Sequence, residues 1–96
     1  MATYMELRSL IGVGTLHDKM EVAVCLKAYA VLQETTPSVA RMAWAKQTLQ
    51  NPKAEADYLL TYALCANAAL TVAQIQAATD AALQANVDSA VNKLYP

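Results

Sequence analysis

The 96-residue sequence has few of the residue types from which catalytic and metal sites are built. It contains one histidine, two cysteines and two glycines, and only 16% of its residues are charged. It has no phosphate-binding loop of the G-x-x-x-x-G-K type, and no paired carboxylates in an apolar pattern that would act as general acid and base. These shortages argue against an enzyme.

The single histidine, His17, is spaced with Glu21 and Cys25 at intervals of four residues, so all three side chains fall on one helix face. Structural zinc takes four nitrogen or sulfur ligands, and Cys65 is the only other cysteine. A nucleophilic pair is also disfavoured, because Cys25 lies about 12 Å from His17 along a helix. Cys65 stays possible as the nucleophile that pairs with His17, but the sequence has no glycine-rich turn that would supply an oxyanion hole for it. We expect no metal, no cofactor and no catalytic residue, and two buried free thiols.

Charge and hydropathy argue against nucleic-acid-binding, membrane-spanning and secreted proteins. The net charge is −1 and the seven cations are spread along the chain, whereas nucleic-acid binding normally needs a basic stripe. Lys27 interrupts the most hydrophobic stretch, so no run approaches a membrane span. The first ten residues lack a basic start and a cleavage site, which favours a reducing compartment over secretion.

The composition predicts one helical domain with apolar surface to spare. Hydrophobic residues make up 56% of the chain, above the average of about 45–50%. Alanine accounts for 20 residues and is the best intrinsic helix former. Because alanine fills little volume, we interpret the surplus as a sign of oligomerisation.

Helix-start signals divide the chain. Thr3-x-x-Glu6, Thr36-Pro37, Asn51-Pro52 and Thr71-x-x-Gln74 each place an oxygen or a proline where a first turn needs it. The signals predict helices over residues 4–11, 16–34, 37–49, 52–67 and 72–94, with a glycine turn at 12–14. The spacing over residues 72–94 permits either one long helix or two helices, over 72–78 and 80–94, and we favour two. No segment alternates with period two, so we expect no sheet.

The predicted fold is therefore an all-α compact bundle of five to six short helices in a single domain, residues 1–96. Residues 1–14 are candidates for a mobile N-terminal helix and hinge, because two glycines in three residues permit unusual backbone angles. Segment 16–34 is apolar almost all round, which predicts a central helix. In the later helices we expect these inward residues: Val39, Met42, Ala43, Leu49, Leu59, Leu60, Ala63, Leu64, Ala66, Val72, Ile75, Leu83, Val87, Val91 and Leu94.

Aromatic residues supply the candidate interface. Trp44 is interpreted as a core anchor, with an interface anchor as the alternative. Tyr58 and Tyr62 fall beside the apolar set of their helix and are interface candidates. Tyr4 and Leu7 join them, since the apolar face of a short N-terminal helix can pack on a neighbouring copy.

Four segments carry a family resemblance: Arg41-Met-Ala-Trp44-Ala, Asn51-Pro52-x-x-Glu55-Ala56, Ala66-Asn67-Ala68 and Thr79-Asp80-Ala-Ala-Leu83-Gln84-x-x-Val87-Asp88-x-Ala90-Val91. Through them, residues 40–94 resemble the small α-helical virion proteins of tailed bacteriophages, found at the capsid, neck or head-to-tail junction. The resemblance implies a non-enzymatic protein present in many symmetry-related copies. The resemblance assigns a functional role to no residue of this sequence.

We therefore expect a structural or assembly protein that oligomerises or docks on a larger particle, a phage virion component made in the host cytoplasm. Its expected partners are itself and other virion proteins, with no specific nucleic acid, membrane or small-molecule substrate. The alternative is a helical DNA-binding or regulatory module built on helices 37–49 and 52–67, although Glu55 and Asp57 would repel phosphate there. An enzyme using Cys65 or His17 would need a cleft that so small a core rarely supplies.

Overall fold

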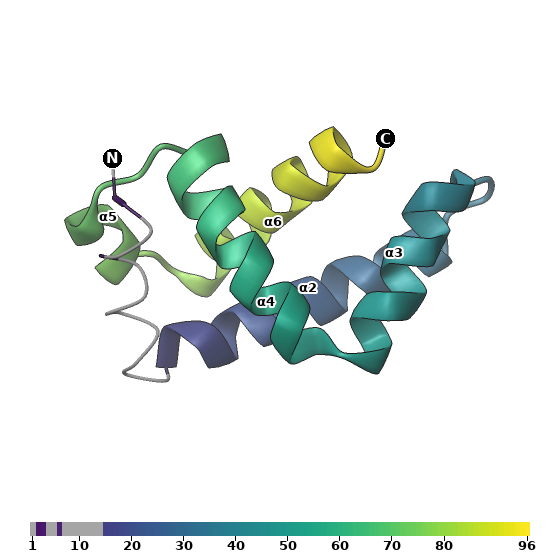
Figure 1. Ribbon diagram of the computed structural model, residues 1–96, viewed down its shortest axis with the longest axis horizontal. Helices are drawn as coiled ribbons and strands as arrows, with labels where there is room; N and C mark the ends of the chain where they lie inside the picture. The colour runs from purple at the N-terminus through teal and green to yellow at the C-terminus, as the bar shows by residue number, and fades with distance from the viewer. Residues whose placement is uncertain (1, 4–5, 7–14) are drawn as a thin grey trace.

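The computed structural model describes residues 2, 3, 6 and 15–96, and every regular element in this part of the chain is a helix (Figure 1). In chain order the elements are α2 (Thr15–Leu32), α3 (Val39–Gln50), α4 (Pro52–Leu60), the π-helix η1 (Thr61–Asn67), α5 (Val72–Gln76) and α6 (Asp80–Leu94). The absence of strands from the described residues confirms the all-α helical bundle. Most of the predicted helix 4–11, including Tyr4 and Leu7, and the glycine turn 12–14 lie outside the described residues.

Side-chain caps start most helices where the sequence predicts. The Asn51 side chain accepts from the Ala54 N–H at 3.4 Å. Thr71 and Gln74 form a complete capping box, in which each side chain accepts from the other residue's backbone N–H. The Thr79 hydroxyl caps α6, which confirms the preferred division of residues 72–94 into two helices.

The chain start is tied to the loop before α5. Thr3 and Glu6 form the predicted reciprocal cap, with both backbone-to-side-chain distances at 3.2 Å. Ala2 is buried in the core, and its N–H donates to the Leu70 carbonyl oxygen at 2.6 Å.

The start of α3 corrects the prediction by two residues. The helix begins at Val39 rather than Pro37, because the Ser38 hydroxyl accepts from the Arg41 N–H at 3.1 Å and caps the first turn. The same hydroxyl donates to the carbonyl oxygen of Pro96 at 2.9 Å, so this cap also holds the C-terminal end.

α2 is the central helix, as predicted, and contacts α3, α4 and α6 (Figure 1). Trp44 of α3 is 3% exposed, which confirms it as a core residue. Its Nε1–H donates to Glu55 at 2.8 Å, and its ring stacks on Tyr95 with centroids 5.9 Å apart. The largest fully buried side chains are Met20, Val24, Val31, Thr48, Leu59, Leu60, Leu64, Ile75, Leu83, Val87 and Val91.

The predicted helix 52–67 is continuous but changes its winding. After Leu60 the backbone passes into η1, where the Ala68 N–H donates to the Ala63 carbonyl oxygen, five residues back. Ala69 then adopts a left-handed φ of 53°, and the Leu70 N–H closes the end on the Leu64 carbonyl oxygen at 2.9 Å.

Several predicted inward residues are wrong. Val39 is 89% exposed and Ala43 is exposed, because α3 turns Trp44, Ala45 and Thr48 toward the core instead. Ala66 is exposed on η1.

Four other inward predictions and one cysteine prediction are only partly met. Met42, Leu49, Val72 and Leu94 are half-buried at the edge of the core. Cys25 is half-buried rather than buried, since it lies on a face of α2 that the other described helices leave open.

None of the described helices combines the length and the hydropathy required to span a bilayer.

Candidate functional site

One face of α2 leaves large apolar side chains exposed although the helix is central to the core. Val22, Leu26 and Tyr29 are 58%, 49% and 56% exposed. Their spacing of four and three residues puts them on one line along the helix, with the half-buried Cys25 between them. We call these four residues the α2 stripe.

An open groove of about 420 Å³ follows the α2 stripe. Asp18 and Glu21 line it together with the stripe, and Pro52, the first residue of α4, also contributes to its lining. The sequence did not reveal this surface, because a helix that is apolar on all sides does not show which side the core leaves uncovered.

The predicted interface tyrosines line a second groove, on α4 and η1. Tyr58 is 53% exposed, whereas Tyr62 is half-buried and packs against the core. Together with Asp57, Thr61 and Cys65 they line an open hollow of about 440 Å³, which we call the tyrosine groove. π-Helical turns are frequent at functional sites, and this one supplies part of the groove wall.

The structure thus brings two of the four predicted interface residues together. Tyr4 and Leu7 lie outside the described residues. The interface role of all four stays a prediction.

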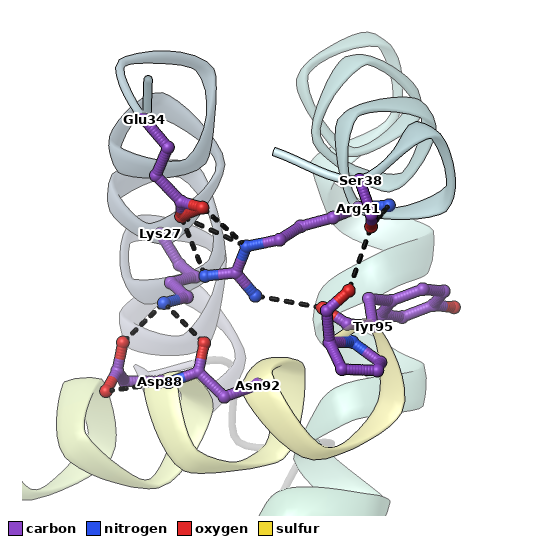
Figure 2. A network of polar contacts seen from close by, with 8 residues as sticks. Lys27, Glu34, Ser38, Arg41, Asp88, Asn92 and Tyr95 are labelled. Atoms are coloured by element: carbon purple, nitrogen blue, oxygen red, sulfur yellow. Dashed lines mark hydrogen bonds and ion pairs between the residues drawn. The ribbon is translucent and has the colours of Figure 1, made fainter. Parts of the chain in front are cut away.

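A polar network joins the C-terminal end of α2, the start of α3 and the end of α6 (Figure 2). Arg41 makes a two-pronged ion pair with Glu34, in which Nε donates to Oε1 at 2.8 Å and Nη2 to Oε2 at 2.7 Å. Its remaining nitrogen, Nη1, donates to the carbonyl oxygen of Tyr95 at 2.9 Å. One side chain thereby fixes three segments that are far apart in the sequence.

Lys27 extends the same network from α2 to α6 (Figure 2). Its ammonium group forms an ion pair with Asp88 and donates to Oδ1 of Asn92 at 3.1 Å. Asn92 in turn donates to the second oxygen of Asp88 at 3.4 Å. The side chains of Lys27 and Arg41 are each only 11% exposed, so both cations lie at the helix junction rather than on open surface.

The electrostatics of this network are those of a structural joint. The hydrogen bond from Arg41 is the main cause that lowers the pKa of the Glu34 carboxyl, and the same bond raises the pKa of the Arg41 guanidinium. Both groups are therefore held in their charged forms. The pair thus connects the helix ends in its charged form.

A three-residue cluster on the first turns of α2 has the donor types for a metal. One ligand atom from each of His17, Asp18 and Glu21 lies within 4.8 Å of the others, and His17 Nδ1 is 3.6 Å from Glu21 Oε2. Cys25, the third member of the spacing found in the sequence, does not belong to this cluster. Three donors on one helix fall short of the four that a structural zinc site needs, so the cluster alone does not define a site.

Both cysteine thiols have pKa values raised above the ordinary value. Burial raises the pKa of the Cys25 thiol, and the charge of Glu21 raises it further. Burial likewise raises the pKa of the Cys65 thiol, with a smaller contribution in the same direction from Glu6. Both cysteines are free, and both pKa shifts favour the unreactive thiol over the thiolate.

Comparisons with models of protein families, with curated proteins and with solved structures return no match for this chain. The resemblance to phage virion proteins stays a prediction.

Proposed function

We propose that this chain is a non-enzymatic structural or assembly protein that associates with copies of itself or docks on a larger particle. The observation that carries the proposal is the exposure of the α2 stripe, where Val22, Leu26 and Tyr29 are each about half exposed. A contiguous apolar surface of this kind marks an interaction site more often than an isolated exposed side chain does.

The tyrosine groove is a second apolar surface that supports the same proposal. Tyrosine concentrates binding energy because it offers a large apolar ring and a polar tip with little side-chain entropy to lose. Tyr58 presents about half of its surface beside the hollow that Tyr62 also lines. Two apolar surfaces on one small chain suit a protein that has more than one neighbour in an assembly.

We further propose that the particle is the virion of a tailed bacteriophage and that the chain occupies its head, neck or head-to-tail junction. The support is the sequence resemblance over residues 40–94, together with surfaces suited to repeated contact.

The DNA-binding alternative has less support. Of the six Lys and Arg residues in the described part of the chain, Lys27 and Arg41 have side chains only 11% exposed and are paired with carboxylates, which leaves them little access to phosphates. The α4 helix, which would serve as the recognition helix, carries Glu55 in its first turn, where a carboxylate repels the backbone of a nucleic acid.

The first test measures the mass of the native protein over a range of concentrations, by analytical ultracentrifugation and native mass spectrometry. We expect oligomers or co-sedimentation with capsid, neck or portal proteins. A chain that stays monomeric at all concentrations and co-sediments with none of these proteins would contradict the proposal.

The second test replaces the two tyrosines together, as Tyr58→Ala with Tyr62→Ala. Loss of interface aromatics costs roughly 2 kcal/mol or more, so we expect association to weaken about 30-fold or more while helical circular dichroism is retained. Val39→Ala is the control, because Val39 is 89% exposed and borders neither groove. If the double variant unfolds, the tyrosines are core residues and the tyrosine groove is not an interface.

A further inference from the structure

We infer that the α2 stripe binds the same stripe of a second copy, with the two α2 helices antiparallel about a two-fold axis beside Cys25. The inference rests on the proposed self-association and specifies its partner, surface and orientation.

The stripe is complementary to itself under this rotation. Val22 and Tyr29 lie at equal distances along the helix from the midpoint between Cys25 and Leu26. A two-fold axis at that midpoint places Val22 of one copy against Tyr29 of the other, and Cys25 against Leu26. Every exposed apolar side chain of the stripe then meets an apolar side chain, and the small Cys25 leaves room for the larger Leu26.

The charges around the groove select the antiparallel orientation. Asp18 and Glu21 line the groove at the N-terminal end of the stripe. A parallel pair would bring these carboxylates against their own copies, and like charges at close range repel. The antiparallel pair places Asp18 opposite Gln33, just after the partner's α2, and Glu21 opposite Ala30, and both of these residues are uncharged. The nearby Glu34 is already paired with Arg41.

The edges of the groove also suit a helix that enters along α2. Pro52 at the start of α4 lines the groove beside the stripe, and the exposed Lys53 follows it. Val22 also borders a smaller hollow lined by Asp80 and Gln84 at the start of α6. An incoming helix therefore meets polar and charged side chains around an apolar centre, which is the usual arrangement of an interface.

The area available sets the expected strength. Covering three half-exposed side chains removes on the order of 300 Å² per copy from water, since a whole aromatic side chain buries about 150–250 Å². A standard stable interface buries about 800 Å² per partner. The stripe alone therefore forms a weak pair, with a dissociation constant in the micromolar to millimolar range, and is populated where copies are held close together.

Cysteine cross-linking tests the orientation directly. In a Cys25→Ala, Cys65→Ala background, an affinity-tagged Val22→Cys variant is mixed with an untagged Tyr29→Cys variant and oxidised at high concentration. Helices packed about 8–10 Å apart bring facing Cα atoms to roughly 4–5 Å, within the range that a disulfide spans. Antiparallel packing predicts mixed dimers, whereas positions 22 of the two copies lie about 10 Å apart along the axis and cross-link poorly to each other.

A substitution in the stripe tests its energetic contribution. Leu26→Asp should raise the dissociation constant at least tenfold, because it puts a carboxylate at the centre of the apolar contact, and circular dichroism should show the fold retained. Val39→Asp, at an exposed position on α3, should leave the dissociation constant unchanged.

The outcomes separate this inference from the proposed function. If copies associate but only like variants cross-link, or Leu26→Asp associates as the parent does, the antiparallel stripe is wrong while the proposed function stands. If the parent chain neither self-associates nor docks on virion proteins, the proposed function fails and the inference fails with it.

Discussion

Among single residues, Thr48 is the one buried polar side chain in the described part of the chain whose side-chain oxygen has no hydrogen-bond partner. It is 1% exposed and lies four residues after Trp44 on the inner face of α3. Its neighbours on that face are satisfied, since Trp44 donates to Glu55 and Arg41 to Glu34. An unpaired hydroxyl in such a position costs stability, because it has lost water and gained nothing in exchange.

Replacing that hydroxyl by a methyl group should therefore stabilise the protein. Thr48→Val keeps the shape of the side chain, and we expect the free energy of unfolding to rise by about 1 kcal/mol. Thr48→Ser is the control, because it keeps the hydroxyl and removes the methyl group, and it should lower stability. Urea denaturation measures both. A loss of stability in the valine variant would mean that the hydroxyl has a partner in solution.

At the scale of helices, the sequence predicts where each helix begins and ends better than which of its faces is buried. A cap is a local event: Asn51, Thr71 and Thr79 each accept from an amide three residues ahead, so the signal and the bond lie in the same short segment. The sequence does not single out Ser38, because Thr36-Pro37 is also a good start signal; in the structure the Ser38 hydroxyl caps α3 and also donates to the carbonyl oxygen of Pro96.

Helix faces depend on contacts that the sequence does not display. In α3 the apolar residues Val39 and Ala43 indicated one face, yet the helix is turned so that Arg41 points inward. A local pattern counts arginine as polar and outward. Here its guanidinium is satisfied by Glu34 and by the Tyr95 carbonyl oxygen, so it is tolerated beside the core.

Only part of the candidate site could be predicted, because the exposure of a helix face depends on contacts with other helices. Tyr58 and Tyr62 could be identified because they fall beside a clear apolar set. The α2 stripe could not, because its exposure depends on where α3, α4 and α6 pack.

The end of η1 provides a test of backbone strain in an element. Ala69 adopts a φ of 53°, a region that costs an alanine about 1 kcal/mol but is open to glycine. Ala69→Gly should raise the free energy of unfolding by roughly 0.5 kcal/mol, after the greater freedom of glycine in the unfolded chain is subtracted. The same change at the exposed Ala85, inside α6, should lower it by about 1 kcal/mol. Thermal unfolding of the pair gives the comparison, and a destabilised Ala69→Gly variant would show that the left-handed turn is not retained in solution.

At the scale of the whole molecule, the polar network determines how the ends of three helices meet. Arg41 connects Glu34, just after α2, to Tyr95, just after α6 (Figure 2). The ring of Tyr95 also stacks on Trp44. The C-terminal end is thereby held against α3 by two kinds of contact. We infer that this joint keeps α2 and α6 in place, and with them the orientation of the α2 stripe.

The joint should make the stability of the whole molecule depend on pH through Glu34. Its ordinary pKa is 4.5, and Arg41 lowers that pKa in the folded state. A carboxyl whose pKa is lowered by folding stabilises the protein above the unfolded-state value, and this contribution is lost as the pH falls through the folded-state value. We therefore expect the difference in free energy of unfolding between the parent and Glu34→Gln to be constant from pH 7 to about pH 5 and to shrink below pH 4.5. In an Arg41→Gln background the same Glu34 substitution should have little pH-dependent effect, because the partner that lowers the pKa is gone. Urea titrations at each pH measure all four proteins, and a difference that stays constant down to pH 3 would show that the Glu34–Arg41 pair is not formed in solution.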